Sequence, residues 1–398
     1  MSKVIAVNSG SSSLKFQLFQ MPEEKVLTSG AAERIGLDMG IFTINVNGEK
    51  IRKEIPIPDH QVAVNLLLEA LVKYGIVKDL TEIQGAGHRI VQGGPYFSSS
   101  VKVDDDVVKK VDELCSIAPL HNHAHLVCYE AFKHALPNIE HVFVFDTAFH
   151  QTMEPESYLF PVPYEWYKDY KVRKYGAHGT SHEFVMKRTA ELMGKKPEDL
   201  NIITCHLGNG ASITAIKNGK CINTSMGLSP LGGVMMGTRS GDIDPTVVYY
   251  MEEKLKCTPE EMDTYLNKKS GMLGISGVSS DARDIQAAVE EGNPRAILTH
   301  KLYVNRVINI VGGYYMQLGH VDAMSFTAGL GEHAVEIRRD ICKGLEEGMG
   351  IRIDYELNSK THNEAKISTP DSKVEVFVVP TNEELVIARD TVRILGLK

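Results

Sequence analysis

Two arginines of the chain stand close to glycines, a setting in which a guanidinium can reach a bound anion. Arg89 lies two residues after Gly87, and Arg239 lies between Gly237 and Gly241. Glycine lets a ligand approach the backbone, while the guanidinium forks onto carboxylate or phosphate oxygens. A surface arginine is more commonly a solvated charge. Because 43 Lys and Arg face 51 Asp and Glu, with a net charge of −8, an anionic ligand must nevertheless depend on such local donors.

Three turns of glycine and small polar residues could hold phosphate groups, at residues 8–13, 208–212 and 329–331. Such turns present backbone N–H groups and hydroxyls to an anion without side-chain bulk. Residues 329–331 also precede a predicted helix, whose N-terminus could take an anion or a ribose. The chain has no G-x-x-x-x-G-K-[ST] and no G-x-G-x-x-G after a strand, which excludes a P-loop and a Rossmann fingerprint. Singly each is an ordinary turn, but three together favour a nucleotide.

Histidines are dense in three places: residues 121–125, His178 with His182, and His206. The alternating histidines of 121–125 have the spacing of a metal site. No carboxylate stands nearby in sequence to support them, so we do not expect a metal there. His178 is the better functional candidate, because it precedes a predicted helix and an imidazole donor there could stabilise charge on a transferring group.

Two carboxylates could face a ligand. Asp146 ends a hydrophobic strand, a position that commonly faces a cleft in α/β proteins, although an N-cap or turn role fits equally well. Near the C-terminus, Thr381 and Glu384 have the spacing of an N-cap and its N3 partner. Glu383 is then free to face a ligand or Mg²⁺, a hard cation that prefers carboxylate oxygen.

The elements that position these residues follow from periodicity and turn chemistry. We expect strands at 4–7, 14–19, 142–145, 202–207, 212–216 and 323–327, and helices at 60–74, about 105–117, 181–193, 294–319 and 333–347. A capping box at Thr180 predicts the start of the third helix, and Gly194 its end. Asn293 before Pro294 predicts the start of the fourth. Asn218-Gly219 predicts a tight hairpin turn.

The organisation of the chain points to more than one domain. Its 398 residues suffice for two to three domains, and 43% hydrophobic with 24% charged residues is ordinary globular composition. Strand–turn–strand units recur near residues 10 and 210, about half the chain apart. They suggest two domains built on one plan, although such hairpins are common.

Composition also limits compartment and partners. The N-terminus lacks the order of a signal peptide, and no apolar run approaches the roughly 18 residues of a membrane span. Six irregularly spaced cysteines indicate reduced thiols in the cytoplasm. The acidic balance argues against nucleic-acid or anionic-membrane partners.

Ten ordered segments across nearly the whole chain resemble the acetate kinase family: VNSGSSSLKFQ, GHRIVQGG, APLHN, VFDTAFHQTM, YGAHGTSH, CHLGNGASI, MGTRSGDIDP, NKKSGMLGISG, TAGLGEH and PTNEELVIAR. The resemblance implies an α/β fold of two duplicated actin-like (ribonuclease H-like) domains around a central nucleotide cleft. They would span 1–150, completed by a C-terminal helix at 384–398, and 151–383 with the nucleotide-binding turns. It also implies a homodimer and gives a reason for the repeated hairpin.

The resemblance further implies roles for matched residues. Arg89 would bind the substrate carboxylate, Arg239 would share the acyl-phosphate charge, His178 would stabilise the transferring phosphoryl group, and Asp146 would be the active-site carboxylate. Asn8 and Glu383 are associated with Mg²⁺, for which Mn²⁺ is an alternative, and Lys15 with ATP. ATP contacts map onto His206, Leu207, Gly208, Asn209, Gly210, Asp281, Ala282, Arg283, Gly329, Leu330, Gly331, Glu332 and His333. The acyl methyl would meet Val91, Leu120, Ala177 and Pro230.

Some positions depart from the family pattern. Ala177 stands where Phe is usual, which would widen the acyl pocket and admit propionate or butyrate. His333 replaces Asn, Gln92 replaces His and Gly232 replaces Glu, and residues 123–125 differ after Asn122, where Pro is common. No matched charged residue is missing, so we expect catalysis to be intact.

The leading hypothesis is an ATP- and Mg²⁺-dependent kinase that interconverts acetate and acetyl phosphate. Phosphoryl transfer needs in-line positioning and charge neutralisation, which two arginines, a histidine and Mg²⁺ would supply. A carboxylic acid is already ionised at pH 7, so we expect Asp146 to orient Arg89 or a metal-bound water rather than to act as a base. The alternatives are a kinase for a longer short-chain acid, an actin-like ATPase without a carboxylate acceptor, and a histidine-rich metallohydrolase.

Overall fold

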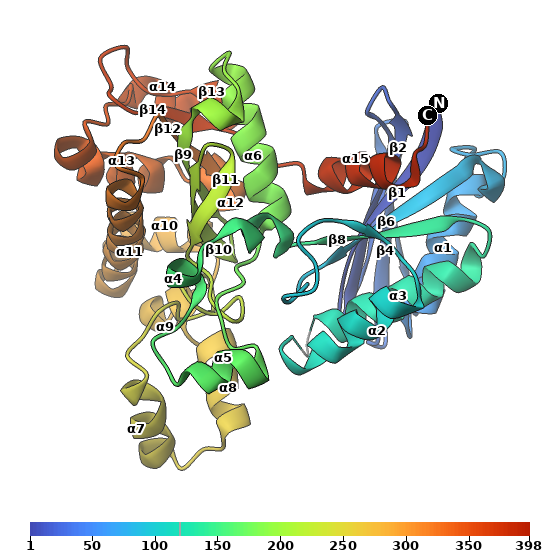
Figure 1. Cartoon of the computed structure of the whole chain (residues 1–398), viewed down its shortest axis with the longest axis horizontal. Helices are drawn as coiled ribbons and strands as arrows, with labels where there is room; N and C mark the ends of the chain where they lie inside the picture. Colours follow the sequence, from blue (N-terminus) through green and yellow to red (C-terminus); the bar gives the residue numbers. More distant parts are fainter. Residues whose placement is uncertain (119–120) are drawn as a thin grey trace. The chain divides into compact units, whose positions relative to one another are not determined.

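The chain divides into two compact units, which we describe separately. Unit 1 comprises Met1–Ala148 and Asn382–Lys398, and unit 2 comprises Phe149–Thr381. The computed structural model describes residues 1–118 and 121–398 (Figure 1). Within the described ranges no helix is both long and apolar enough to cross a bilayer.

Unit 1 contains an eight-stranded mixed sheet in the order β5-β4-β3-β2-β1-β6-β8-β7. Its strands are β1 (Ser2–Gly10), β2 (Ser13–Met21), β3 (Lys25–Glu33), β4 (Gly40–Val46), β5 (Glu49–Ile55), β6 (Ile83–Ile90), β7 (Val101–Lys102) and β8 (Glu140–Phe145). Strands β1 to β5 form an antiparallel meander, whereas β1, β6 and β8 run parallel. The carboxyl ends of these three parallel strands therefore lie along one edge of the sheet.

Helices cover both faces of this sheet. They are α1 (His60–Lys73), α2 (Asp105–Glu113), α3 (Asn122–Ala135) and α15 (Glu383–Leu395). Figure 1 shows α1 and α3 on one face and α15 on the other, and α15 packs on β1, β6 and β8. A Cβ on Gly87 would lie 2.2 Å from the Thr391 hydroxyl and 2.5 Å from an Ile387 methyl, so only glycine allows this close approach.

Four histidines are buried among the described residues of unit 1, and three of them, His88, His125 and His141, have pKa values below the usual one. His88 Nε2 lies 3.0 Å from His141 Nδ1, and His141 Nε2 has no hydrogen-bond partner among the described residues. Burial lowers the pKa of His141 to about 4 and, with a contribution from the Arg89 charge, that of His125 to about 3. Burial, then His141, holds the pKa of His88 well below its usual value. These rings are therefore neutral in the folded protein at pH 7.

The free energy of unfolding should fall steeply between pH 6.5 and about pH 4. The unfolded chain protonates these histidines below their ordinary pKa of about 6.5, whereas the folded protein does not, so acid favours unfolding. As the pH falls through that window, each histidine lowers the free energy of unfolding by up to about 1.4 kcal/mol per pH unit. Above pH 7 the histidines cause no pH dependence, because they are neutral in both the folded and the unfolded state. Urea unfolding at pH 7, 6 and 5 measures the slope. The variant His141→Leu should reduce it and an exposed-site control, His134→Gln, should not; equal slopes would contradict the assignment.

Unit 2 contains a six-stranded sheet in the order β11-β10-β9-β12-β14-β13. Its strands are β9 (Asn201–Leu207), β10 (Ala211–Lys217), β11 (Lys220–Thr224), β12 (Ala323–Thr327), β13 (Ala365–Lys366) and β14 (Glu375–Val378). An antiparallel β9-β10-β11 meander continues into parallel β12 and β14. This is the order and direction of β3-β2-β1-β6-β8 in unit 1. The two units are therefore duplicated actin-like domains, and the repeated hairpin joins the first two strands of each.

Helices flank the second sheet on both faces (Figure 1). All helices of unit 2, those that flank the sheet and those that lie away from it, are α4 (Pro155–Tyr158), α5 (Tyr164–Tyr170), α6 (Gly179–Leu192), α7 (Thr246–Leu255), α8 (Pro259–Lys268), α9 (Gly271–Ser276), α10 (Ala282–Glu290), α11 (Pro294–Leu318), α12 (Ala328–His333), α13 (Val335–Met349) and α14 (Tyr355–Lys360). Side chains of α6 pack on one face, and side chains of α11 and α13 form the larger core on the other.

Most predicted elements are confirmed, with ends displaced by a few residues. The N-cap of α11 is Asn293, whose side chain accepts from two backbone N–H groups. Asn218 and Gly219 both have positive φ in the β10–β11 turn. The predicted helix at 105–117 ends as an α-helix at Glu113 and tightens into a 3₁₀ turn at Leu114–Ser116.

Three local predictions are wrong. Helix α6 begins at Gly179, before the predicted capping box, and His178 holds the N-cap position with a left-handed φ of 58°. Residues 329–331 are not a turn, because they lie inside α12, and the following helix begins at Val335. The cap of α15 is Asn382 rather than Thr381, since the Asn382 side chain accepts from Leu385 N.

Candidate active site

Arg89 is the centre of a charged group in unit 1 that we call the Arg89 cluster: Asn8, Arg89, Asp146 and Glu383. Its Nε donates to Asp146 Oδ1 at 3.0 Å and its Nη2 pairs with Oδ2, so the guanidinium forks onto the carboxylate. Its Nη1 donates to Asn8 Oδ1 at 3.2 Å, and Nε lies 3.7 Å from Glu383 Oε2. Asp146 is fully buried, whereas the Arg89 and Glu383 side chains stay 16% and 15% exposed.

The fold assembles this cluster at one edge of the sheet. Asn8 lies near the carboxyl end of β1, Arg89 near that of β6, and Asp146 directly follows β8, with its N–H donating to Ile90 O. Adjacent parallel strands commonly bring functional side chains together at their carboxyl ends. Glu383 opens α15, the helix that packs on the same three strands.

Electrostatics within the cluster favour a cationic Arg89. Burial opposes its charge, but Asp146 and Glu383 outweigh that cost and raise the Arg89 pKa above its usual value. Burial raises the pKa of Glu383 to about 7, even though Arg89 and, more weakly, Lys15 pull it down. Lys15 itself is exposed on β2, where it pairs in register with Asn8. Glu383 is therefore a carboxyl group whose negative charge is not fully compensated.

Arg239 of unit 2 is half-buried, and no carboxylate among the described residues forms an ion pair with it. Its Nη1 donates to Pro230 O at 3.2 Å, and burial lowers its pKa. A Cβ built on Gly210 would lie 3.4 Å from Arg239 Nη1 and 3.5 Å from His178 Nε2. The Arg239 guanidinium and the His178 imidazole thus converge on the β9–β10 turn. An anion at this place would meet these two side chains and the glycine backbone of the turn.

Close backbone packing holds this part of unit 2. A Cβ on Gly237 would lie 1.8 Å from Asn209 Oδ1, and Gly237 N donates to Asn209 O at 3.0 Å, so a larger residue would have to displace the Asn209 side chain. The left-handed φ of His178 is uncommon for a residue with a side chain and is typical of functional positions. The close contact of Gly237 with Asn209 and the backbone conformation of His178 therefore hold Asn209 and His178 in place beside Arg239.

A cavity of about 650 Å³ lies in unit 2 between α9, α10, α11 and the α12–α13 segment. Seven of the predicted nucleotide residues line it: Asn209, Asp281, Ala282, Arg283, Gly329, Leu330 and His333. His206, Leu207, Gly208, Gly210, Gly331 and Glu332 lie in neighbouring elements without lining it. Asp281 caps α10 and pairs with Arg283 at 2.5 Å.

The predicted acyl-pocket residues belong to different units. Val91, in unit 1, is buried, and its N–H donates to His125 Nδ1 at 3.3 Å. In unit 2, Ala177 is buried in the larger hydrophobic core, and Pro230 bonds Arg239 through its carbonyl. Leu120 lies outside the described residues. The histidines of 121–125 take separate environments, because His123 is exposed and His125 is buried.

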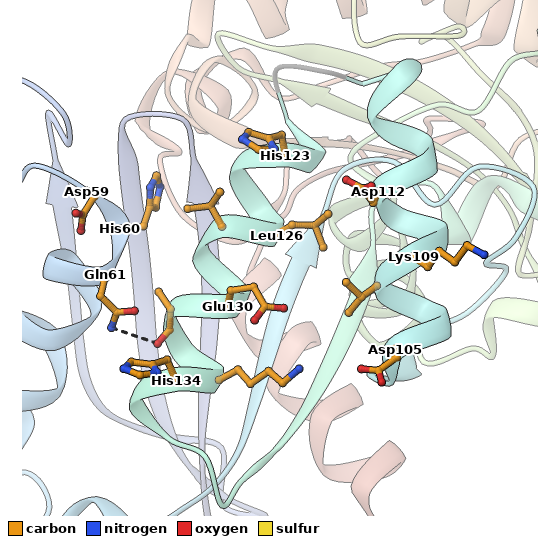
Figure 2. A pocket seen from close by; sticks show the side chains of 14 residues that line it. Asp59, His60, Gln61, Asp105, Lys109, Asp112, His123, Leu126, Glu130 and His134 are labelled. Carbon is orange, nitrogen blue, oxygen red and sulfur yellow. Dashed lines mark hydrogen bonds between the residues drawn. The ribbon is translucent and has the colours of Figure 1, made fainter.

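A second hollow, of about 940 Å³, lies in unit 1 beside the start of α1 and the helices α2 and α3 (Figure 2). Of the predicted site residues that the structure describes, none lines it. Gln61 spans it with a hydrogen bond to Ala131 O at 3.5 Å. His60, at its edge, bonds Gly10 O at 2.8 Å and so ties α1 to the turn that follows Asn8.

The duplicated strand order of the two units, with polar and charged groups at the carboxyl ends of parallel strands, defines the actin-like class of proteins. A family model described as the acetokinase family matches residues 3–389. The chain belongs to this family. It is 55% identical to an acetate kinase of Bacillus velezensis, with 99% of this chain and all of the relative covered.

Solved structures agree with this membership. The acetate kinase of Porphyromonas gingivalis is 45% identical, with a TM-score of 0.95, and 99% of this chain and 100% of that chain are covered. A propionate kinase from Francisella tularensis is 39% identical, with a TM-score of 0.93 and the same coverage. The chain is therefore an enzyme of the kinase class, with ATP or ADP as co-substrate.

Sequence reasoning missed several residues around these groups. Thr204 and Ser212 contact His182 and His178, and Tyr303 and Ile337 line the 650 Å³ cavity. For Thr204 and Ser212, the available signal was that Thr204 and His206 alternate along one strand, which places their side chains on the same face of the sheet. The cavity residues lie on helix faces whose apolar periodicity does not distinguish a core from a cavity wall.

Proposed function

We propose that the protein transfers the γ-phosphoryl group of ATP to acetate and reversibly forms acetyl phosphate and ADP. The observation that carries the proposal is the half-buried Arg239, which converges with His178 and has no carboxylate partner among the described residues. Such a cation is poised for a ligand anion, and phosphoryl transfer is accelerated chiefly by charge neutralisation and positioning. We take acetate as the acceptor because the relatives are named acetate kinases.

We assign the chemistry as follows. Arg89 binds the acetate carboxylate, and Asp146 holds the Arg89 guanidinium in place. Because the acceptor is already ionised at pH 7, no base has to remove a proton from it. Arg239 and His178 donate to the oxygens of the transferring phosphoryl group. The 650 Å³ cavity, with Asp281 and the α12 residues, receives the adenosine portion.

The donor set of Asn8 and Glu383 fits Mg²⁺. Both offer oxygen, and both lie at the Arg89 cluster, where Glu383 carries a charge that its neighbours leave partly uncompensated. Mg²⁺ typically takes one or two protein oxygens and completes its shell with waters and substrate phosphates. When bound, the ion would neutralise phosphate charge.

A longer carboxylic acid is the second candidate substrate. Ala177 carries one methyl where the family pattern has an aromatic ring, and a structural neighbour at 39% identity is named a propionate kinase. Ala177 and Pro230, both in unit 2, would then border a wider acyl pocket. The acetate assignment has the stronger support, because relatives that are 55% and 54% identical to this chain carry that name.

A hydroxylamine trap of acyl phosphate with Mg-ATP tests the function across formate, acetate, propionate and butyrate. We expect kcat/KM to peak at acetate. A peak at propionate or butyrate would keep the reaction and reassign the substrate. ATP hydrolysis without trapped product for any acid would overturn the proposal and favour the actin-like ATPase. Omitting Mg²⁺ and adding EDTA should abolish product formation.

We also propose a homodimer, supported by α7. This helix has no buried residue, and Tyr249 and Tyr250 are 65% and 56% exposed. A short helix gains most of its stability from packing, so an uncovered aromatic helix favours a second copy as its cover.

Replacing both Tyr249 and Tyr250 by Glu should convert the dimer to a monomer. Burying two carboxylates at an interface is strongly unfavourable. Sedimentation velocity measures the state, and Tyr355→Glu on α14 is the control, since it alters an exposed tyrosine elsewhere. A monomeric parent protein, or a variant that stays dimeric, would refute the assignment to α7.

We propose a cytoplasmic location and assign the two predicted domains, 1–150 with 384–398 and 151–383, to units 1 and 2. The six cysteines are free thiols, which supports a reducing compartment.

A further inference from the structure

A chain of buried hydrogen bonds in unit 2 connects Thr204 to His178. His182 Nδ1 lies 2.6 Å from Thr204 Oγ1, and His182 Nε2 lies 2.7 Å from Ser212 Oγ. Ser212 Oγ in turn lies 2.9 Å from His178 Nδ1. Thr204, His182 and Ser212 are completely buried. Three elements contribute: β9 carries Thr204, β10 carries Ser212, and α6 carries His182 with His178 at its cap.

Each hydrogen bond in the series from Thr204 to His178 is donated in the same direction, toward His178. Burial, and then the neighbouring His150 and His206, lower the pKa of His182 far below its usual value, so this ring is neutral with one donor and one acceptor nitrogen. Within the described residues His182 Nδ1 is the one acceptor near the Thr204 hydroxyl. Since a buried hydroxyl hydrogen without an acceptor costs free energy, Thr204 donates to Nδ1.

The remaining assignments follow from that first one. With Nδ1 accepting, His182 carries its hydrogen on Nε2 and donates to Ser212 Oγ. Ser212 then has its single hydrogen available for its other partner, His178 Nδ1. A neutral His178 that accepts at Nδ1 carries its own hydrogen on Nε2, the nitrogen that converges with Arg239 Nη1 on Gly210.

We propose that Thr204, His182 and Ser212 are positioning residues that fix His178 as the neutral tautomer with hydrogen on Nε2. This rests on the proposed function, in which Nε2 donates to the transferring phosphoryl group. This relay of Thr204, His182 and Ser212 resists protonation of His178 at Nδ1. A proton there would leave the Ser212 hydrogen without its acceptor or, if Ser212 and His182 reversed, the Thr204 hydrogen without one.

The second histidine beside His178 favours the same state. The rings of His178 and His206 stack with centroids 4.0 Å apart and planes inclined by 20°, and Ser181 Oγ lies 2.8 Å from His206 Nδ1. Two stacked imidazoles at this distance resist simultaneous protonation, because like charges repel in a partly buried site. A proton on His206 would therefore disfavour a second proton on His178.

The test compares Thr204→Val with Thr189→Val. Valine keeps the shape of threonine and removes only the hydroxyl. Thr189 is the matched control: it is equally buried on α6, and its hydroxyl bonds Val185 O and Ser325 Oγ, outside the relay. We expect Thr204→Val to lower kcat about tenfold, with the KM values for ATP and acetate within twofold of the parent. Its acid limb in the pH profile should move to higher pH. Thr189→Val should stay within twofold, and Thr204→Ser should restore activity.

Nitrogen-15 NMR of histidine-labelled protein reads the tautomer directly. The parent should show His178 with hydrogen on Nε2, and Thr204→Val should show a mixture. Equal kinetics for the two valine variants, or hydrogen on His178 Nδ1 in the parent protein, would overturn the relay. If the parent forms no acyl phosphate, the proposed function fails, while the NMR result still tests the hydrogen arrangement independently of folding in the variants.

Discussion

Replacing Asp146 by asparagine should lower kcat/KM for acetate about a hundred- to a thousandfold. Asp146 is fully buried and forks onto Arg89, which makes it the group that fixes the orientation of that guanidinium. Asparagine keeps the shape but offers one acceptor oxygen without charge, so Arg89 can turn toward Glu383, already 3.7 Å away. Orientation errors of this kind weaken both binding and transfer.

Two measurements separate positioning by Asp146 from base catalysis. If Asp146 acts through Arg89, the loss should be nearly independent of pH from 6 to 9. In a variant that already carries Arg89→Gln, Asp146→Asn should then cause little further loss of kcat/KM, because the effects of substituting two coupled residues are not additive. Loss of the acid limb alone, or full additivity, would instead identify a base.

Glu364→Gln is the matched control for Asp146→Asn. Glu364 also forms a forked pair, with Arg188 at 2.7 Å through two nitrogens, but this pair is exposed in unit 2. Exposed ion pairs contribute at most about 1 kcal/mol. The variant should therefore keep parental kcat.

Arg239→Ala should lower kcat about a thousandfold without destabilising the fold. The guanidinium is half-buried with no carboxylate partner among the described residues, so its desolvation is a cost to the folded protein. Removing it relieves that cost, whereas the transferring phosphoryl group loses a donor at the moment its charge must be neutralised. Acyl phosphate assays measure the loss, and thermal unfolding should give a Tm equal to or above that of the parent.

Two further arginine variants sharpen this test. Arg239→Lys keeps the charge but not the forked geometry, and it should retain intermediate activity. Arg295 donates to Ile275 O and Gly274 O, so Arg295→Ala should lower the Tm and leave kcat near the parental value. A large loss of stability in Arg239→Ala, with activity falling in proportion, would mean that Arg239 is structural.

Local sequence signals predicted correctly the elements that begin or end at a residue type with a strong preference for that position. Asn293-Pro294 started a helix and Asn218-Gly219 made a hairpin turn, because one residue type strongly prefers each position. The cap of α15 was missed because Thr381 and Asn382 are adjacent and both suit an N-cap. Packing of the helix on the sheet, rather than local preference, selects between them.

Other parts of the site depend on contacts that sequence does not display. His178 adopts a left-handed backbone ahead of α6, where local preference favours the capping box at Thr180. The pairing of Asp146 with Arg89 joins residues of two parallel strands, and the relay joins β9, β10 and α6. Spacing along the chain says little about such long-range neighbours, so those residues were found through family resemblance or only in the structure.

Helix α15 has a consequence for biosynthesis. Glu383 and the helix that packs on β1, β6 and β8 are made after all of unit 2, which occupies more than half of the chain. Translation at about 5–20 residues per second separates the two parts of unit 1 by some tens of seconds. During that interval the nascent first sheet lacks the cover of one face and the carboxylate beside Arg89. The growing polypeptide therefore has an exposed apolar surface that a chaperone could bind until α15 has been made.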